Sequence, residues 1–220
     1  MPRNLTQAHV AQFRTRLCDV AARLYFELGH SNFNMRDLAA RVGVSAMTPY
    51  RYFGDKEGIL AAVRAGGFAR LADRLEAAVP QGPAAVMQTY IRFAMDEAAY
   101  YRLIFDLSQP SVPPAELAHQ QRRIIWAMMG TTTAGRTVSQ AEMSARSLWV
   151  TLHGAICLVL AGKLSETELG DLASQLALVI LGINHRFVVP PIQTSAASRA
   201  SAKFGPAMVH QAAAANIAAE

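Results

Sequence analysis

One pair of side chains in this sequence has the spacing of reactive chemistry, His153 and Cys157. Residues four apart share one face of a helix, so an imidazole and a thiol at this spacing are a candidate metal pair, or a candidate base and nucleophile. Neither has a second ligand, an acidic residue or a glycine-rich turn beside it. The sequence also lacks a phosphate-cradling glycine loop and paired carboxylates in a catalytic context. We therefore expect no enzyme activity, no metal and no cofactor.

A denser group of chemically useful side chains lies in the N-terminal quarter of the chain. Ser45 and Thr48 carry hydroxyls in the first turn of a predicted short helix, where hydroxyls and free backbone N–H groups favour phosphate oxygens. Arg51 can donate twice to guanine, while Ala46 and Met47 offer apolar contact to a thymine methyl. The net charge of +5 also suits an anionic partner. These residue types indicate contact with double-stranded DNA.

The composition favours a helical fold, because 52% of the residues are hydrophobic, 17% are charged and runs of β-branched residues are few. Cys18 and Cys157 are far apart among helix-spaced apolar residues, which predicts buried thiols in a reducing cytosol. The N-terminus shows no secretory signal. The most apolar segment, 148–161, is shorter than the ~20 residues that span a bilayer. We expect a cytoplasmic protein with no membrane partner.

Helices must position the predicted DNA contacts. Apolar residues at spacings of three and four predict a first helix over about 6–28, which Gly29 ends. Asn34 has a short polar side chain that suits the cap of a second, short helix, and Gly43 terminates that helix.

A third and a fourth helix follow. Ser45 is expected to cap the third, over 46–52, and Asp55 to cap the fourth. Two short helices joined by a tight turn form a helix-turn-helix, which places its second helix in the major groove of DNA. Pro49 lies at the fourth position of that helix, lacks the N–H that would bond the Ser45 carbonyl, and disfavours helical geometry at Thr48. We therefore expect a loosened or 3₁₀ first turn.

These segments, in this order, resemble the N-terminal signature of the tetracycline-repressor (TetR) family of bacterial regulators. The resemblance rests on the stretches 21–29, 35–45 and 50–57, and it extends over about residues 12–63. Each short motif alone would be weak evidence, whereas the ordered series is specific.

The resemblance implies a division of labour among the DNA contacts. Lys56 matches the family's phosphate-anchoring lysine, and Tyr50 and Tyr52 match its aromatic contacts. Arg36, near the start of the second helix, is a candidate phosphate contact; a solvated charge is the alternative for both cations. The full predicted set is Arg36, Ser45, Ala46, Met47, Thr48, Tyr50, Arg51, Tyr52 and Lys56.

The rest of the chain is predicted to be a larger helical bundle, which makes the protein all-α with about nine helices in total. Helical patterns cover residues 84–107, 115–130, 140–162 and 166–187. We assign residues 1–64 to a helix-turn-helix domain with its fourth helix continuing to about 79, residues 65–188 to an effector-binding and dimerisation domain, and residues 189–220 to a flexible tail.

In the resembled family this larger region binds a small effector and forms the dimer. Residues 148–154 resemble a recurrent Trp-x-x-x-His-Gly stretch in one branch of the family, and residues 100–105 resemble a tyrosine-and-phenylalanine segment of the same branch. Large side chains on these helices are candidates for the lining of an apolar pocket, with ordinary core packing as the alternative. They are Phe93, Tyr101, Phe105, Trp126, Met129, Trp149 and His153.

The last two predicted helices, 140–162 and 166–187, carry more apolar surface than one small domain usually hides. Pairing them with their copies in a four-helix arrangement would bury both apolar stripes, and burial within the monomer is the alternative. The dimer is favoured because two recognition helices would then bind two half-sites.

The sequence thus predicts a homodimeric, ligand-responsive transcriptional repressor that a small apolar effector releases from a palindromic operator. The alternative, from a different class, is a constitutive DNA-binding protein whose C-terminal domain only dimerises or binds a protein partner.

Overall fold

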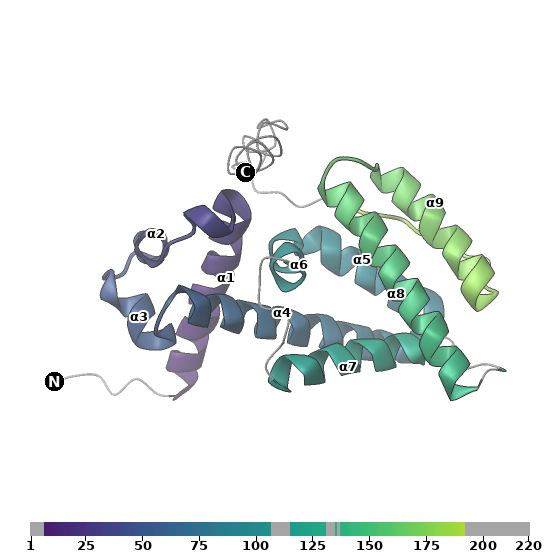
Figure 1. Ribbon diagram of the computed structural model, residues 1–220, viewed down its shortest axis with the longest axis horizontal. Helices are drawn as coiled ribbons and strands as arrows, with labels where there is room; N and C mark the ends of the chain where they lie inside the picture. The colour runs from purple at the N-terminus through teal and green to yellow at the C-terminus, as the bar shows by residue number, and fades with distance from the viewer. Residues whose placement is uncertain (1–6, 107–114, 131–134, 136, 192–220) are drawn as a thin grey trace, which may run out of the picture.

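A computed structural model of the protein describes residues 7–106, 115–130, 135 and 137–191. Within these residues the fold consists of nine α-helices and no strand, as the sequence predicts. Figure 1 shows α1, α2 and α3 gathered at one end, with α4 running from them along the larger helical part. The helices are α1 (Gln7–Asn32), α2 (Met35–Val42), α3 (Met47–Phe53), α4 (Lys56–Ala78), α5 (Pro83–Asp96), α6 (Ala98–Ile104), α7 (Ala115–Met129), α8 (Val138–Leu160) and α9 (Glu166–Leu176).

Local caps set most of the N-terminal boundaries. The Asn34 side chain accepts a hydrogen bond from the Asp37 N–H at 2.9 Å, and Asp55 accepts one from the Gly58 N–H at 2.7 Å. Both predicted caps are therefore confirmed. The first helix breaks at Gly29, as predicted, because φ 74° and ψ 172° at this residue are not helical; a short second helical segment then continues to Asn32.

The predicted helical stretch 84–107 is instead two helices, α5 and α6, which break at Glu97 (φ −119°, ψ 43°). The Glu97 carboxylate accepts hydrogen bonds from Arg70 and Arg74, both on α4. The packing of α6 on α4 is also close, since a Cβ at Gly67 would lie 2.6 Å from a methyl of Ile104. Tertiary contacts to α4 thus accompany the break, and no local sequence signal indicates it.

The last predicted helix, 166–187, is too long. Helix α9 ends at Leu176, one π-helical turn follows, and Gly182 closes it in the left-handed conformation with φ 70°. The chain then runs back without helix, and the Gln88 side chain pairs with the backbone of Val188 through hydrogen bonds of 2.7 and 3.3 Å. We call this pair of hydrogen bonds the Gln88 clamp, and Phe187 is buried beside it. Of the predicted tail, residues 192–220 lie outside the described part of the chain.

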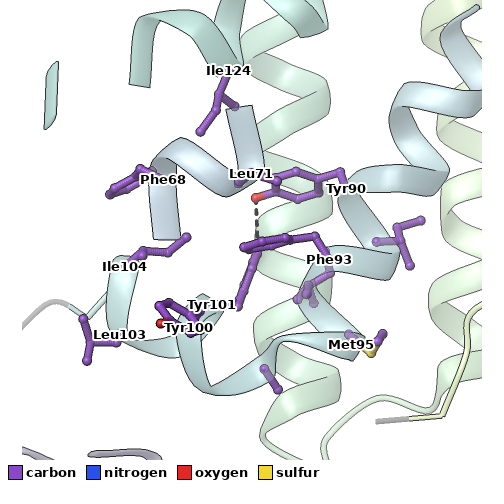
Figure 2. Packing of buried hydrophobic residues seen from close by; sticks show 14 of the residues in the cluster. Phe68, Leu71, Tyr90, Phe93, Met95, Tyr100, Tyr101, Leu103, Ile104 and Ile124 are labelled. Carbon is purple, nitrogen blue, oxygen red and sulfur yellow. Dashed lines mark hydrogen bonds between the residues drawn. The ribbon is translucent and has the colours of Figure 1, made fainter. Parts of the chain in front are cut away.

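One continuous apolar core joins the two ends of the molecule. Figure 2 shows its centre, where Phe68 and Leu71 from α4 meet Tyr90 and Phe93 from α5 and Tyr101 from α6. The same cluster reaches buried residues of α1, α2, α8 and α9. Helix α4 therefore packs against both the helix-turn-helix and the larger part of the protein.

Helix α8 is longer than the predicted apolar segment 148–161. Among the described residues it is the one helix whose length and composition would allow it to cross a membrane, with a mean hydropathy of 1.4 over its most apolar 18 residues. Eight of its residues are buried within the protein, so the apolar character is explained in part by core packing.

Candidate functional site

The helix-turn-helix presents most of its predicted DNA contacts to solvent. Met47 is 63% exposed and Tyr50 41% exposed, and Thr48 is half-buried. The other exposed members of the set are Arg36, Ser45, Ala46 and Arg51. Large side chains exposed on a seven-residue helix do not contribute to the core, so their position suits contact with another molecule.

The first turn of α3 is tightened around Pro49, as the sequence predicts. The Thr48 N–H donates to the Ser45 carbonyl at 2.8 Å, a three-residue bond of the 3₁₀ type, and this occupies the carbonyl that Pro49 cannot reach. Pro49 itself is buried. The predicted Ser45 cap is wrong, because α3 begins at Met47 with Ala46 as its N-cap and without a side-chain cap. The Ser45 hydroxyl accepts only a long bond from the Met47 N–H, with an N···O distance of 3.4 Å.

Helix α1 packs against α3, the recognition helix of the helix-turn-helix, through contacts that the sequence did not indicate. Arg14 donates to the Tyr52 carbonyl at 2.5 Å, and its guanidinium lies 4.5 Å from the Phe53 ring centroid. The Tyr52 ring packs against Phe13 with a centroid distance of 5.1 Å. Tyr52 is thus half-buried and partly structural, and Arg14 satisfies a carbonyl at the end of α3.

The two predicted phosphate contacts differ in their surroundings. Arg36 is exposed and forms no ion pair among the described residues. Lys56 is half-buried, and its ammonium donates to the His30 carbonyl at 2.5 Å. The lysine therefore also ties the start of α4 to the end of α1, a role that the sequence did not indicate.

Four of the seven predicted pocket residues come together in one aromatic cluster. Phe105 lies at its centre, with ring centroids 4.9 Å from Tyr101, 6.1 Å from Trp149 and 4.4 Å from His153. These residues come from α6, α8 and the residue that follows α6. The cluster is a tertiary assembly of segments about fifty residues apart.

A hydrogen-bond chain runs through this cluster. The Trp149 indole donates to the Tyr90 hydroxyl at 3.0 Å, the hydroxyls of Tyr90 and Tyr101 lie 2.9 Å apart, and the Tyr101 hydroxyl lies 2.7 Å from Nδ1 of His153. Figure 2 shows Tyr90 and Tyr101 in the core. Tyr90 is fully buried and was missed by the sequence analysis. Its position within the amphipathic segment gave no sign of a polar partner.

The direction of this chain follows from its first donor. An indole N–H can only donate, so Tyr90 accepts from Trp149. Both buried tyrosine hydrogens find an acceptor within the chain only if Tyr90 donates to Tyr101 and Tyr101 donates to Nδ1 of His153, and we assign this direction. The imidazole is then neutral, with its hydrogen on Nε2. Burial lowers the pKa of His153, which agrees with this assignment. A proton on Nδ1 would leave one of the two buried tyrosine hydrogens without an acceptor in the chain.

His153 and Cys157 do lie together, with Nε2 of the imidazole 3.5 Å from the thiol sulfur. Partial desolvation by neighbouring groups raises the pKa of the Cys157 thiol, which disfavours the reactive thiolate. The prediction that Cys157 is buried is wrong, because its side chain is exposed on α8. Cys18 is half-buried, and burial raises its pKa to about 11. Among the described residues, no three His, Cys, Asp or Glu side chains form a metal-binding group.

The other three predicted pocket residues lie elsewhere. Phe93 is fully buried in the core, and the Arg74 guanidinium lies 5.3 Å from its ring centroid. Trp126, which is 65% exposed, and Met129 line a cavity of about 480 Å³ between α7 and α8. Trp149 also lines this cavity and so joins it to the hydrogen-bond chain.

A polar network links the helix-turn-helix to the larger part of the protein. Arg70 on α4 donates to Asp19 of α1 at 2.8 Å and to Glu97 at 3.4 Å. The Tyr100 hydroxyl donates to the same Asp19 carboxylate at 2.6 Å, and the Arg70 guanidinium lies 4.4 Å from the Tyr100 ring centroid. Tyr100 is adjacent to Tyr101, so α6 contacts α1 with one tyrosine and the buried hydrogen-bond chain with the next.

Two family models match the chain. The model described as bacterial regulatory proteins, tetR family, matches residues 17–63, and the model described as tetracyclin repressor-like, C-terminal domain, matches residues 84–180. Together they cover more than half of the sequence and both parts of the fold. The chain belongs to the TetR family. It is a DNA-binding transcriptional regulator by family, and no curated protein matched it.

Solved structures of regulators share this TetR fold. SCO4313, a protein proposed to be regulatory, is 23% identical over 83% of this chain and 100% of its own, with a TM-score of 0.71. The transcriptional regulator FadR from Bacillus subtilis, solved with stearoyl-CoA, is 17% identical over 77% and 98%, with a TM-score of 0.63. PfmR from Thermus thermophilus is 18% identical over 78% and 97%, with a TM-score of 0.59. At these identities the likeness establishes the fold.

Proposed function

We propose that this TetR-family chain is a homodimeric repressor that binds a palindromic operator and is released from it by a small, largely apolar ligand. The observation that carries the proposal is the position of α6. Tyr100 on this helix bonds Asp19 of α1, while the adjacent Tyr101 bonds His153 in the larger domain. A ligand that moves α6 would therefore change contacts at the helix-turn-helix.

DNA binding rests on the exposed surface of α2 and α3. Arg51 and Arg36 supply cationic donors without acidic partners among the described residues, and Ser45 and Thr48 offer hydroxyls beside the first turn of α3. Arginine suits bidentate contact to guanine or phosphate. Met47, at 63% exposure, supplies the apolar contact expected for a thymine methyl.

The ligand-responsive part is the aromatic cluster together with the adjoining cavity between α7 and α8. Trp149 belongs to both, because it lines the cavity and donates to Tyr90. A ligand against Trp149 would disturb the chain that ends in His153 and passes through α6. The Trp149, His153 and Gly154 spacing supports placing the domain in the Trp-x-x-x-His-Gly branch of the family.

Dimerisation is supported by apolar side chains left exposed at the C-terminal end. Val150 is 61% and Leu158 49% exposed on α8, and Leu178 is 52% and Val179 78% exposed in the turn after α9. Exposed apolar residues on two adjacent elements favour burial against a second copy. Such a dimer would act in the cytoplasm and would present two recognition helices to two half-sites.

The test begins with selection of genomic fragments by the purified full chain, followed by titration of the selected operator at several salt concentrations. We expect Lys56→Ala to weaken binding to all sequences and to reduce the slope of log affinity against log salt by about 1 for each phosphate group that is no longer bound. Arg92→Ala, at an exposed position on α5, is the matched control and should leave the slope unchanged.

Release is measured on the same operator complex with a panel of apolar ligands, following the fluorescence of Trp126 and Trp149 in parallel. Loss of operator binding together with a fluorescence change supports the repressor proposal. If the panel changes neither signal, the chain is a constitutive DNA-binding protein and the ligand-responsive proposal is wrong.

A further inference from the structure

The cavity between α7 and α8 is largely apolar but is not electrically neutral. Its volume of about 480 Å³ is within the usual range for small-molecule sites. Ile125, Trp126 and Met129 of α7 and Trp149 of α8 provide apolar walls. Trp126 is 65% exposed, which is unusual for an indole that has no partner molecule.

The charged side chains that line the cavity carry an excess positive charge. Glu142 and Arg146 lie one turn apart on α8 and pair with each other, since Arg146 donates to one Glu142 oxygen from two nitrogens at 3.0 and 2.7 Å. Arg122 on α7 is exposed and forms no ion pair among the described residues. One guanidinium therefore lacks a described counter-charge at the edge of an apolar surface.

The next residue, Arg123, shows that arginines on α7 do not all lack ion-pair partners. Arg123 donates to Glu76 and Asp73, both on α4, and faces away from the cavity into that ion-pair network. Of the two adjacent arginines, one is neutralised within the fold and the other lines the cavity. Arg122 also precedes Trp126 by one helical turn, so the charge and the exposed indole lie on the same face of α7.

We propose that the cavity takes an amphipathic organic anion, whose acid group pairs with Arg122 and whose apolar part packs on Trp126, Met129 and Trp149. This rests on the proposed ligand-responsive function and names the class of its ligand. A carboxylate or a phosphate accepts two parallel hydrogen bonds from a guanidinium. A neutral ligand would displace water from the guanidinium of Arg122 without pairing with its charge, and a cation would be repelled by that charge.

The position of Trp149 connects this ligand to the rest of the protein. Its ring lines the cavity, and its N–H is the first donor of the chain through Tyr90 and Tyr101 to His153. A bound apolar chain that shifts the indole removes the donor that sets the direction of the whole chain. Pairing with Arg122 therefore holds the ligand in the cavity, and its contact with Trp149 changes the hydrogen-bond chain.

The experiment compares three probes of equal length, octanoate, 1-octanol and octylamine, by tryptophan fluorescence and titration calorimetry on the full chain. We expect octanoate to bind at least about tenfold more tightly than 1-octanol, a difference of about 1.4 kcal/mol, and octylamine to bind most weakly. Arg122→Gln should remove the preference for the acid while leaving the 1-octanol affinity within about twofold. Arg92→Gln is the control for a surface arginine remote from the cavity.

Equal affinities for the three probes, a preference for octylamine, an unchanged preference in Arg122→Gln, or no binding of any probe would each overturn the proposal. Thermal unfolding of Arg122→Gln checks that the exposed substitution leaves the fold intact. Titration of the operator complex tests the ligand class separately from the repressor mechanism. Arg122-dependent binding of octanoate without release of DNA supports the ligand class and contradicts the repressor mechanism. Release of DNA by a neutral ligand, independent of Arg122, supports the repressor mechanism and contradicts the ligand class.

Discussion

Replacing Tyr101 with phenylalanine would remove one hydroxyl from the middle of the buried hydrogen-bond chain. That hydroxyl accepts from Tyr90 at 2.9 Å and donates to His153 at 2.7 Å. The Tyr90 hydroxyl has no exposure to solvent, so its hydrogen would be left buried without an acceptor. Such a group costs about 1–3 kcal/mol of unfolding free energy. The Phe105 ring contact at 4.9 Å is kept, so no cavity is created to add to this cost.

The measurement is urea unfolding followed by circular dichroism, with the midpoint and the slope fitted separately. We expect Tyr101→Phe to lower the midpoint by the equivalent of about 1–3 kcal/mol without changing the slope, because the fold and its buried area are unchanged. Tyr50→Phe is the control, since Tyr50 is 41% exposed and its hydroxyl has no role in the chain. Its effect should stay within about 0.5 kcal/mol.

A double variant tests the reason as well as the size of the effect. Tyr90→Phe alone leaves the Trp149 N–H without its acceptor, whereas adding it to Tyr101→Phe removes the very hydroxyl that the first change had stranded. The double variant should therefore lose less stability than the two single variants added together. Strict additivity, or a loss below about 0.5 kcal/mol in Tyr101→Phe, would refute the directed chain.

Three further predictions concern pH, assembly and coupling. Burial holds the pKa of His153 below its unfolded value of about 6.5, so the unfolded chain binds more protons, and the stability that this residue contributes is complete above pH 6.5 and is lost as the pH falls. The urea midpoints at pH 7.5 and 5.5 should therefore differ less in His153→Gln than in the wild type. An equal difference in the two proteins would contradict this. Val179→Glu places a charge at a position that is 78% exposed, so sedimentation should show dissociation of the dimer with unchanged helicity, and an intact dimer would exclude this surface as the interface. Arg70→Met removes the bonds to Asp19 and Glu97; the operator should still be bound while ligand-induced release weakens, and full release would show that coupling takes another route.

Local sequence signals predicted the N-terminal part well, because the groups that define it lie three or four residues apart. The caps at Asn34 and Asp55 bond N–H groups three residues on, and Gly43 adopts the left-handed conformation that ends α2. The effect of Pro49 was also predictable, since it acts within a single turn. The contact of Tyr52 with Phe13 was not predictable, because residues 39 apart meet only in the folded chain.

The larger domain was predicted less completely, and the failures share a cause. The break at Glu97 accompanies ion pairs to α4, and the shortened α9 ends where the chain turns back to the Gln88 clamp. Arg122 could have been found from its spacing to Trp126 and Met129, which puts all three along α7 at helical intervals. Nothing local distinguishes Arg122 from Arg123, whose acidic partners come from another helix.

The sequence by itself determined that this chain is helical, that it carries a helix-turn-helix and that it resembles TetR regulators, because periodicity, caps and ordered motifs are properties of neighbouring residues. Only the tertiary structure decided which polar groups meet. Trp149, Tyr90, Tyr101 and His153 come from three helices, and their hydrogen bonds span 11 to 59 residues. Such contacts depend on how the helices pack, and a hydroxyl in an apolar segment does not reveal the partner that burial requires.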